Sequence, residues 1–339
     1  MFITCQKIRY KMLKRIKKPL IGVLAAAMLY TGIQCQKKYY FSNALKETAK
    51  LSLDAVVNNP PDIKDNELYM DTHMHLKDPS YYPQGIEEIV ETSMKKADII
   101  VVMTHNQGDN TSLDYEKFRS YVKQNPKYSI NDYGKYLEIK TENDRLIAIK
   151  AQEIRSKSGR DVLAIGCDGT IGSYQDIRDT IKEIHSQNGI AIIAHPMSIQ
   201  KDSSFFGITL ADKEERKELE QLCVEADALE EFNSQNYLWL CYSNVLTEAF
   251  AKKHGLSGTA GSDTHFDLKQ VGLSGIIIKK DLLHIENLVE DLRKAIKNKN
   301  FKNHKEYSDP ISFFRIMAFP LLKNKLSDNL SLYTKLEEF

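Results

Sequence analysis

Histidine and acidic residues recur in short motifs that could bind metal ions. His73 and His75 stand two residues apart in the segment Asp71-Thr72-His73-Met74-His75, and Asp263 and His265 have the same spacing. Residues two apart on an extended chain point to the same side, so each pair can present two donors to one ion. Both pairs therefore predict ligands of a metal centre.

Further candidate ligands follow apolar runs elsewhere in the chain. They are His105, Glu153, His195 and Glu230. A single polar residue at the end of a strand is more often a cap or a buried hydrogen-bonding group. Five of the nine histidines fall in such positions, however, and this recurrence favours a metal site.

The mixture of donors indicates which ions to expect. Imidazole and carboxylate ligands without cysteine favour zinc, manganese or iron. We expect two or three divalent ions, with Glu153, midway through the set, bridging two of them. Close metal ions lower the pKa of bound water and clamp a phosphoryl group. The donor set thus predicts a metal-dependent hydrolase.

An alternation of strands and helices must position these donors. Apolar, β-branched runs predict strands at 68–71, 98–104, 146–151, 162–166, 190–195, 228–232, 259–263 and 275–278. Helical segments are predicted at 87–96, 177–188, 213–223 and 237–253, with Gly189 and Gly255 as helix stops. This order favours a parallel α/β sheet closed into a barrel, with the functional groups at the C-terminal ends of the strands.

The order of the motifs resembles the polymerase and histidinol phosphatase (PHP) family over residues 66 to 280. The matching segments are Asp71 to His75, Met103-Thr104-His105, Ala151-Gln152-Glu153, Ala194-His195-Pro196, Glu230-Glu231-Phe232-Asn233 and Gly261-Ser262-Asp263-Thr264-His265. The resemblance implies a distorted seven-stranded (β/α) barrel that holds two or three metals and usually has phosphoesterase activity.

The resemblance also implies how the ligands are shared. One metal would be bound by His73, His75, Glu153 and Asp263, with Glu153 bridging to a neighbour. A second metal would be bound by His105 and His265, and a third by His195. Asp78, five residues before Pro83, matches a further ligand of the family.

Two positions depart from the family pattern. Thr104 replaces an Asp, and Arg160 stands where the family often has a His. Arginine has no lone pair for a metal, so the neighbouring Asp161 is an alternative ligand. Alternatively the third site is weakened and Arg160 contacts a substrate phosphate.

These features favour a phosphoesterase that uses metal-activated hydroxide on a small phosphorylated molecule or nucleotide. His195 or His265 could assist the leaving group, although this role competes with metal binding. Two alternatives stay open, namely hydrolysis of a non-phosphate ester or amide bond, and a degenerate membrane-tethered binding protein.

The N-terminal segment predicts a membrane attachment. Residues 1–18 carry seven Lys or Arg and no acid, and residues 20–33 are apolar. A signal anchor ranks first, a cleaved signal peptide with secretion second and a lipoprotein third. The remaining chain has 40 basic against 46 acidic residues, which argues against binding to long nucleic acids.

The expected organisation is therefore a basic and apolar segment at 1–36, a linker at 37–65, the barrel at 66–300 and a helical tail at 301–339. The sequence identifies no protein partner.

The positive residues before the apolar run should stay in the cytoplasm, so the barrel is expected to be periplasmic or extracellular. A C-terminal fusion to a reporter that is active only outside the cytoplasm should then be active. Activity of a cytoplasm-only reporter at the same position would contradict this orientation.

Overall fold

The computed structural model describes residues 61–76, 85–105, 114–200, 208–236, 241–265 and 268–308. The predicted N-terminal anchor, Asp78 and most of the predicted tail lie outside the described residues. Among the helices within these ranges, none combines the length and the apolar character needed to cross a membrane.

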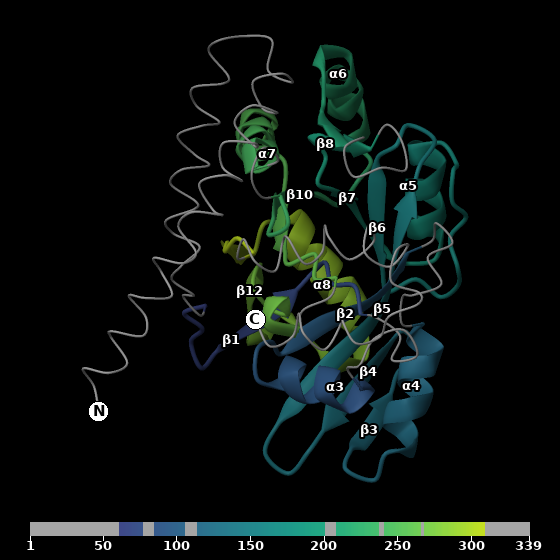
Figure 1. Ribbon diagram of the computed structural model, residues 1–339, viewed down its shortest axis with the longest axis vertical. Coiled ribbons are helices and arrows are strands. Elements are labelled where there is room, and N and C mark those ends of the chain that lie inside the picture. Colours follow the sequence, from purple (N-terminus) through teal and green to yellow (C-terminus); the bar gives the residue numbers. More distant parts are fainter. Residues whose placement is uncertain are drawn as a thin grey trace, which may run out of the picture.

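One large mixed sheet forms the centre of the molecule (Figure 1). Its main path runs in the order β11-β10-β7-β6-β5-β2-β1-β12-β13. The strands are β1 (Glu67–Asp71), β2 (Ile99–His105), β5 (Arg145–Arg155), β6 (Asp161–Ile165), β7 (Ile190–Ala194), β10 (Ala228–Asn233), β11 (Gly258–Gly261), β12 (Gly275–Lys279) and β13 (Phe301–His304). Hairpin strands β3 (Ser129–Asp132) and β4 (Tyr136–Lys140) join at β5, and β8 (Ser198–Gln200) pairs separately with β9 (Ile208–Leu210).

The sheet curls into a nearly closed barrel. The segment after β1 reaches the segment after β11 through a parallel bridge between Met74 and Thr264. The backbone N–H of His75 donates to the Thr264 carbonyl at 2.8 Å, and His75 also bridges to Met103 after β1 and β2 diverge. The predicted α/β barrel is therefore confirmed as a mixed, nearly closed barrel.

The expectation of parallel strands throughout is wrong at β6 and β12. β6 runs antiparallel to both β5 and β7, because the connection from Arg155 to Asp161 is too short for a parallel crossover. β12 runs antiparallel to β1. As a consequence, the start of β6 lies beside the C-terminal ends of β5 and β7.

Helices cover the sheet and bury its apolar side chains. They are α3 (Ile86–Met94), α4 (Tyr115–Gln124), α5 (Ile177–Ser186), α6 (Lys213–Leu222), α7 (Cys241–His254) and α8 (Leu288–Lys297), with short 3-10 turns at η3 (Leu268–Gln270), η4 (Lys280–Leu282) and η5 (Ile285–Asn287). Alternate β6 residues enter different cores. Leu163 packs with β1, β2 and α8, whereas Val162 packs with α5 and α6.

Helix ends follow local sequence signals. Asp212 and Glu215 form a capping box at the start of α6, and Gly255 has a left-handed φ of 63° after α7. The predicted stop at Gly189 is displaced, because Asn188 takes the left-handed conformation after α5, with φ 54°. Gly189 is instead required by close packing, since a Cβ there would lie 2.4 Å from Cys167 Sγ.

The predicted tail begins inside the sheet. β13 pairs antiparallel with β12, and Ser308 N–H donates to the Ser234 carbonyl at 3.0 Å. Residues 301–308 therefore extend the barrel described above past the predicted boundary at 300.

Asp227 joins four elements just before β10. Its buried carboxylate accepts from Ala191 N–H at 2.9 Å and Arg293 Nε at 3.0 Å, and it lies 2.9 Å from His185 Nε2. Burial raises the pKa of Asp227, but these hydrogen bonds outweigh burial and lower it to about 2.

Replacing this carboxylate should destabilise the fold in a pH-dependent way. Asp227→Asn is expected to lower the free energy of unfolding at pH 7 by about 2 kcal/mol, from the difference between folded and unfolded pKa. Because the pKa of Asp227 is lowered in the folded state, its carboxylate stabilises the fold fully at pH values above the ordinary pKa of 3.8. This stabilisation is lost as the pH falls towards about 2. Urea unfolding between pH 3 and 7 measures both. The exposed Asp168→Asn is the control; equal losses in the two variants would contradict the prediction.

Candidate metal centre

The segments that follow β1 and β11 are clamped together by the buried carboxylate of Asp71. Its Oδ1 accepts from the backbone N–H of Ser262 at 3.1 Å and of His73 at 3.3 Å, and its Oδ2 accepts from Gly272 N–H at 3.0 Å. Burial raises the pKa of Asp71 to about 6, although the hydrogen bonds lower it. Asp71 thus fixes the backbone that carries His73 and Asp263.

His73, His75 and Asp263 form the first of two candidate metal clusters. The Nε2 atoms of His73 and His75 lie 3.0 Å apart, and Asp263 Oδ1 lies 3.2 Å and 3.4 Å from them. Two donors that each lie about 2.0–2.1 Å from one ion stand roughly 3.0–3.4 Å apart, so this cluster has the dimensions of a coordination shell.

The proton arrangement in this cluster also fits a metal. His73 Nδ1 donates to Glu230 Oε1 at 2.8 Å, which places the lone pair of the neutral ring on Nε2. Asp263 Oδ1 is buried without a hydrogen-bond donor among the described residues. Burial lowers the pKa of His73, but Asp263, Glu230 and Glu153 outweigh burial and raise it well above its ordinary value. The pocket therefore favours a positive charge between these donors.

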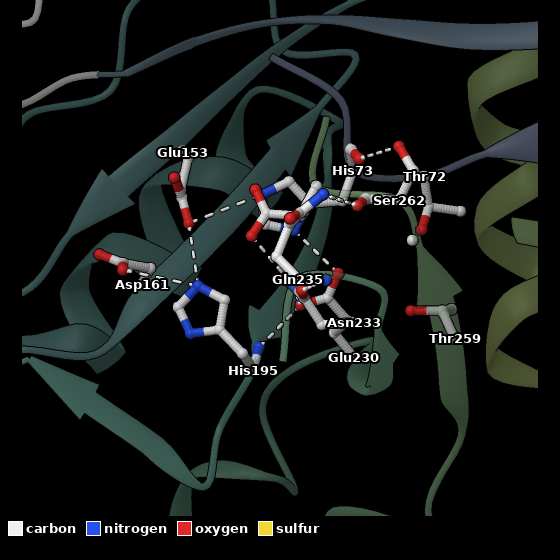
Figure 2. Close-up of polar contacts among 12 residues, drawn as sticks. Thr72, His73, Glu153, Asp161, His195, Glu230, Asn233, Gln235, Thr259 and Ser262 are labelled. Carbon is white, nitrogen blue, oxygen red and sulfur yellow. Dashed lines mark hydrogen bonds and ion pairs between the residues drawn. The ribbon is translucent and has the colours of Figure 1, made fainter. Parts of the chain in front are cut away.

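Glu230 lies behind His73 rather than among the converging Nε2 atoms. Besides His73, it accepts from the His195 backbone N–H at 2.9 Å and from Asn233 Nδ2 at 3.1 Å (Figure 2). Asn233 Nδ2 also donates to Asp263 Oδ2 at 3.0 Å. In this structure, the predicted ligand Glu230 holds the candidate ligands His73 and Asp263 in place, directly and through Asn233.

Glu153, Asp161 and His195 form the second cluster. His195 Nε2 lies 3.3 Å from Glu153 Oε1 and 3.8 Å from Asp161 Oδ2, and Figure 2 shows both carboxylates facing this nitrogen. Burial lowers the pKa of His195, but Glu153 and Asp161 outweigh it and raise it to about 9. Burial and Glu153 raise the pKa of Asp161 to about 6.

Glu153 connects the two clusters. Its Oε2 lies 3.3 Å from His75 Nε2, and its Oε1 lies 3.7 Å from His73 Nε2 on the side that faces His195. One carboxylate oxygen can therefore face each cluster, which is the arrangement that the bridging role predicted from the sequence requires.

Two of the candidate ligands have strained backbones. His195 has a φ of 28° and Asp263 a φ of 51°, in a region that costs a side chain about 1–3 kcal/mol. His195 also precedes Pro196, where extended backbone is normally preferred. Such strain is concentrated at functional sites, and here the backbone conformation turns both side chains toward the clusters.

The other predicted residues are placed as follows. The His265 ring centroid lies 4.6 Å from that of His75, and His265 Nδ1 donates to the Asp263 carbonyl at 2.8 Å. The His105 backbone pairs in register with Glu153, which brings it to the same end of the barrel. Asp78 lies outside the described residues.

Arg160 does not join either cluster. Its buried guanidinium donates to the backbone carbonyls of Pro196 and Glu215, which tie the loop after His195 to α6. This placement gives Arg160 a packing role behind His195, and the predicted contact with a substrate phosphate finds no support in it.

Three residues of the site were given no firm role by sequence reasoning. Asp161 was only an alternative to Arg160, and Asp71 and Asn233 stood inside recognised motifs without an assigned function. The short loop from Arg155 to Asp161 is the signal that would have identified a hairpin, and with it the position of Asp161 beside Glu153.

Comparisons with known proteins agree with this architecture. Residues 242–296, from α7 to α8, match the family model described as PHP-associated, which confirms the predicted resemblance to the PHP family. The comparison with curated proteins gives no match. The fold is similar to the crystal structure of PsfC from Pseudomonas syringae PB-5123, with a TM-score of 0.51 and 14% identity over 77% of this chain and 99% of that one.

Two further solved structures have lower scores. The lesion-specific endonuclease PfuEndoQ from Pyrococcus furiosus has a TM-score of 0.44 and 13% identity over 70% of this chain and 57% of its own. A Bifidobacterium adolescentis protein, provisionally named a metal-dependent phosphoesterase, has a TM-score of 0.39 and 12% identity over 61% of this chain and 89% of its own.

Gly261 should be essential for assembling the first cluster. A Cβ at this position would lie 2.5 Å from His73 Cβ and 2.8 Å from Glu230 Oε1. We expect Gly261→Ala to push His73 out of place, to lower the free energy of unfolding by about 1–3 kcal/mol and to weaken metal binding. Calorimetric titration with Zn²⁺ and thermal unfolding measure both effects.

Gly85→Ala is the matched control, because a Cβ there has no atom within 4 Å and φ is −75°. Unchanged zinc affinity in Gly261→Ala would show that His73 tolerates the displacement.

Proposed function

We propose that this chain is a metal-dependent phosphoesterase that acts on a small phosphorylated molecule or nucleotide. The observation that supports it most directly is the position of Glu153, with one oxygen 3.3 Å from His75 Nε2 and the other 3.3 Å from His195 Nε2. Two donor clusters on either side of one carboxylate suit a pair of divalent ions. Such ions lower the pKa of a water and stabilise charge on both sides of an in-line phosphoryl displacement.

Some residues of the site would bind the ions, and others hold those ligands in position. His73, His75, Asp263 and Glu153 would hold one ion, and Glu153, Asp161 and His195 the other. Glu230 orients His73 through Nδ1, and Asn233 orients Asp263. Fixed ligands of this kind need little rearrangement during the reaction.

His265 is suited to handle a proton at the edge of the site. Its side chain is 23% exposed, and the Asp263 carbonyl holds its Nδ1–H, so the neutral ring presents Nε2 as the acceptor. In this proposal, His265 Nε2 takes or returns a proton of the substrate or a water, unless it binds an ion. His195 is a less suitable acid, because its Nε2 faces the carboxylates of Glu153 and Asp161.

The proposal also includes the class of substrate and the location of the enzyme. The acidic body of the chain supports a small substrate over long nucleic acids, and the basic and apolar N-terminal residues support attachment to a membrane with the barrel outside the cytoplasm.

Removing a central ligand should abolish turnover. His73→Ala is expected to lower kcat/KM for p-nitrophenyl phosphate or bis(p-nitrophenyl) phosphate by about a thousandfold or more, because a lost ion forfeits several kcal/mol of transition-state stabilisation. Chelation by EDTA should do the same to the wild type, and added Mn²⁺ or Zn²⁺ should restore the wild type alone.

His284→Ala is the control, because the imidazole of this exposed histidine pairs with Asp291 and belongs to neither cluster. Bound metal together with hydrolysis of p-nitrophenyl acetate but no phosphoester would favour an ester hydrolase. A purified chain that binds no metal would overturn the proposal in favour of a binding protein.

A further inference from the structure

Arg155 forms an ion pair with Asp161, one of the two carboxylates of the second cluster. Arg155 Nη2 donates to Asp161 Oδ2 at 2.8 Å, and Arg155 Nε donates to Asp161 Oδ1, so the guanidinium engages both oxygens. The two residues are directly opposite each other in the β5–β6 hairpin. Arg155 is 13% exposed and Asp161 3%, so this is a largely buried pair.

The same carboxylate is the one that would complete the second cluster. Asp161 Oδ2, which accepts from Arg155, also lies 3.8 Å from His195 Nε2. Arg155 follows Glu153 by two residues on β5 and therefore faces the same side of the sheet. The positive charge of Arg155 therefore already lies beside Asp161, the carboxylate that would attract an ion to the second cluster together with Glu153.

The first cluster has a different electrostatic environment. Neither Asp263 nor Glu230 has a Lys or Arg partner among the described residues, and both contact histidines and Asn233. The charge of these carboxylates is therefore available to a metal ion, whereas the charge of Asp161 is already balanced by Arg155.

We propose that Arg155 is a built-in cation that keeps the second cluster weak, so that the chain holds one ion tightly at the first cluster and a second ion only at high metal concentration. This inference rests on the proposed function, since it concerns the metal loading of the same site. Arg155 is a positioning residue here, acting on the ion through Asp161.

Two physical effects produce this weakening. A bidentate arginine engages one lone pair on each Asp161 oxygen, so an ion at this carboxylate must share it with the guanidinium or displace the guanidinium. Arginine cannot give up its proton, so its charge stays beside the ion and repels it at any accessible pH. If activity needs both ions, it would then continue to rise with free metal concentration after the first cluster is saturated.

The test is a calorimetric titration of the metal-free full chain with Zn²⁺. Mass spectrometry counts the bound metal ions. The wild type should bind one equivalent tightly and a second at least about tenfold more weakly. Arg155→Met should tighten the second equivalent at least about tenfold and leave the first unchanged. Adding Asp161→Asn to Arg155→Met should remove the gain, because the freed carboxylate is then absent.

Arg145→Met is the matched control. Arg145 is at the other end of β5 and also pairs with a carboxylate of a neighbouring strand, with Nε 2.6 Å from Glu138 Oε1. It should leave both equivalents unchanged. If thermal unfolding shows that Arg155→Met does not fold, Arg155→Gln, whose amide still donates to Asp161, replaces it and should tighten the second equivalent in the same direction.

Two results would overturn the inference. One is a wild type that binds two equivalents with equal affinity, and the other is a folded Arg155 variant whose second equivalent is no tighter than that of the wild type. Neither result depends on turnover, so loss of phosphoesterase activity with the expected binding pattern would count against the proposed function alone.

Discussion

The clamp between the segment after β1 and the segment after β11 is the interaction on which the metal centre depends. Asp71 accepts hydrogen bonds from both segments, His75 N–H donates to the Thr264 carbonyl, and the Met74–Thr264 bridge continues the contact. These bonds close the barrel and bring His73 and His75 against Asp263. Closure of the fold and assembly of the first cluster are therefore one event.

This coupling explains why several buried carboxylates are tolerated at the end of the barrel that carries the two clusters. Burying an uncompensated carboxylate costs several kcal/mol, and the site contains Asp71, Glu153, Asp161, Glu230 and Asp263. Backbone N–H groups satisfy Asp71, imidazole and amide donors satisfy Glu230, and Arg155 satisfies Asp161. Glu153 and Asp263 are left facing histidine nitrogens, which is where a divalent cation would compensate them best.

Sequence reasoning located the central donors because their placement depends on a simple rule. His73, His195 and Asp263 follow strands that point the same way, and Glu153 lies near the end of another such strand, β5. Such strands deliver their ends to one edge of a sheet. The rule fails at β6, which runs the other way, so its first residue and not its last reaches the site. The sequence offered Asp161 only as an alternative ligand, and its pairing with Arg155 follows from that reversal.

The remaining differences depend on side-chain directions that spacing does not determine. The register of β10 against β11 shifts between Glu230 and Phe232, and Glu230 turns behind His73. Arg160 lies next to Asp161 in the sequence but points to the opposite side of the hairpin, toward Pro196 and Glu215. Two adjacent residues at the start of β6 therefore have separate roles, Asp161 in the candidate metal centre and Arg160 in packing.

The contact between Asp71 and Ser262 also has a consequence for synthesis, because it joins residues 191 positions apart. A ribosome that adds roughly 5–20 residues per second needs on the order of 10–40 s to make that interval. During this time the first strand has neither β12 nor the Gly261–His265 loop as a partner. A nascent chain that ends before these segments has both histidines of the opening motif but lacks Asp263, so high-affinity metal capture belongs to the end of translation.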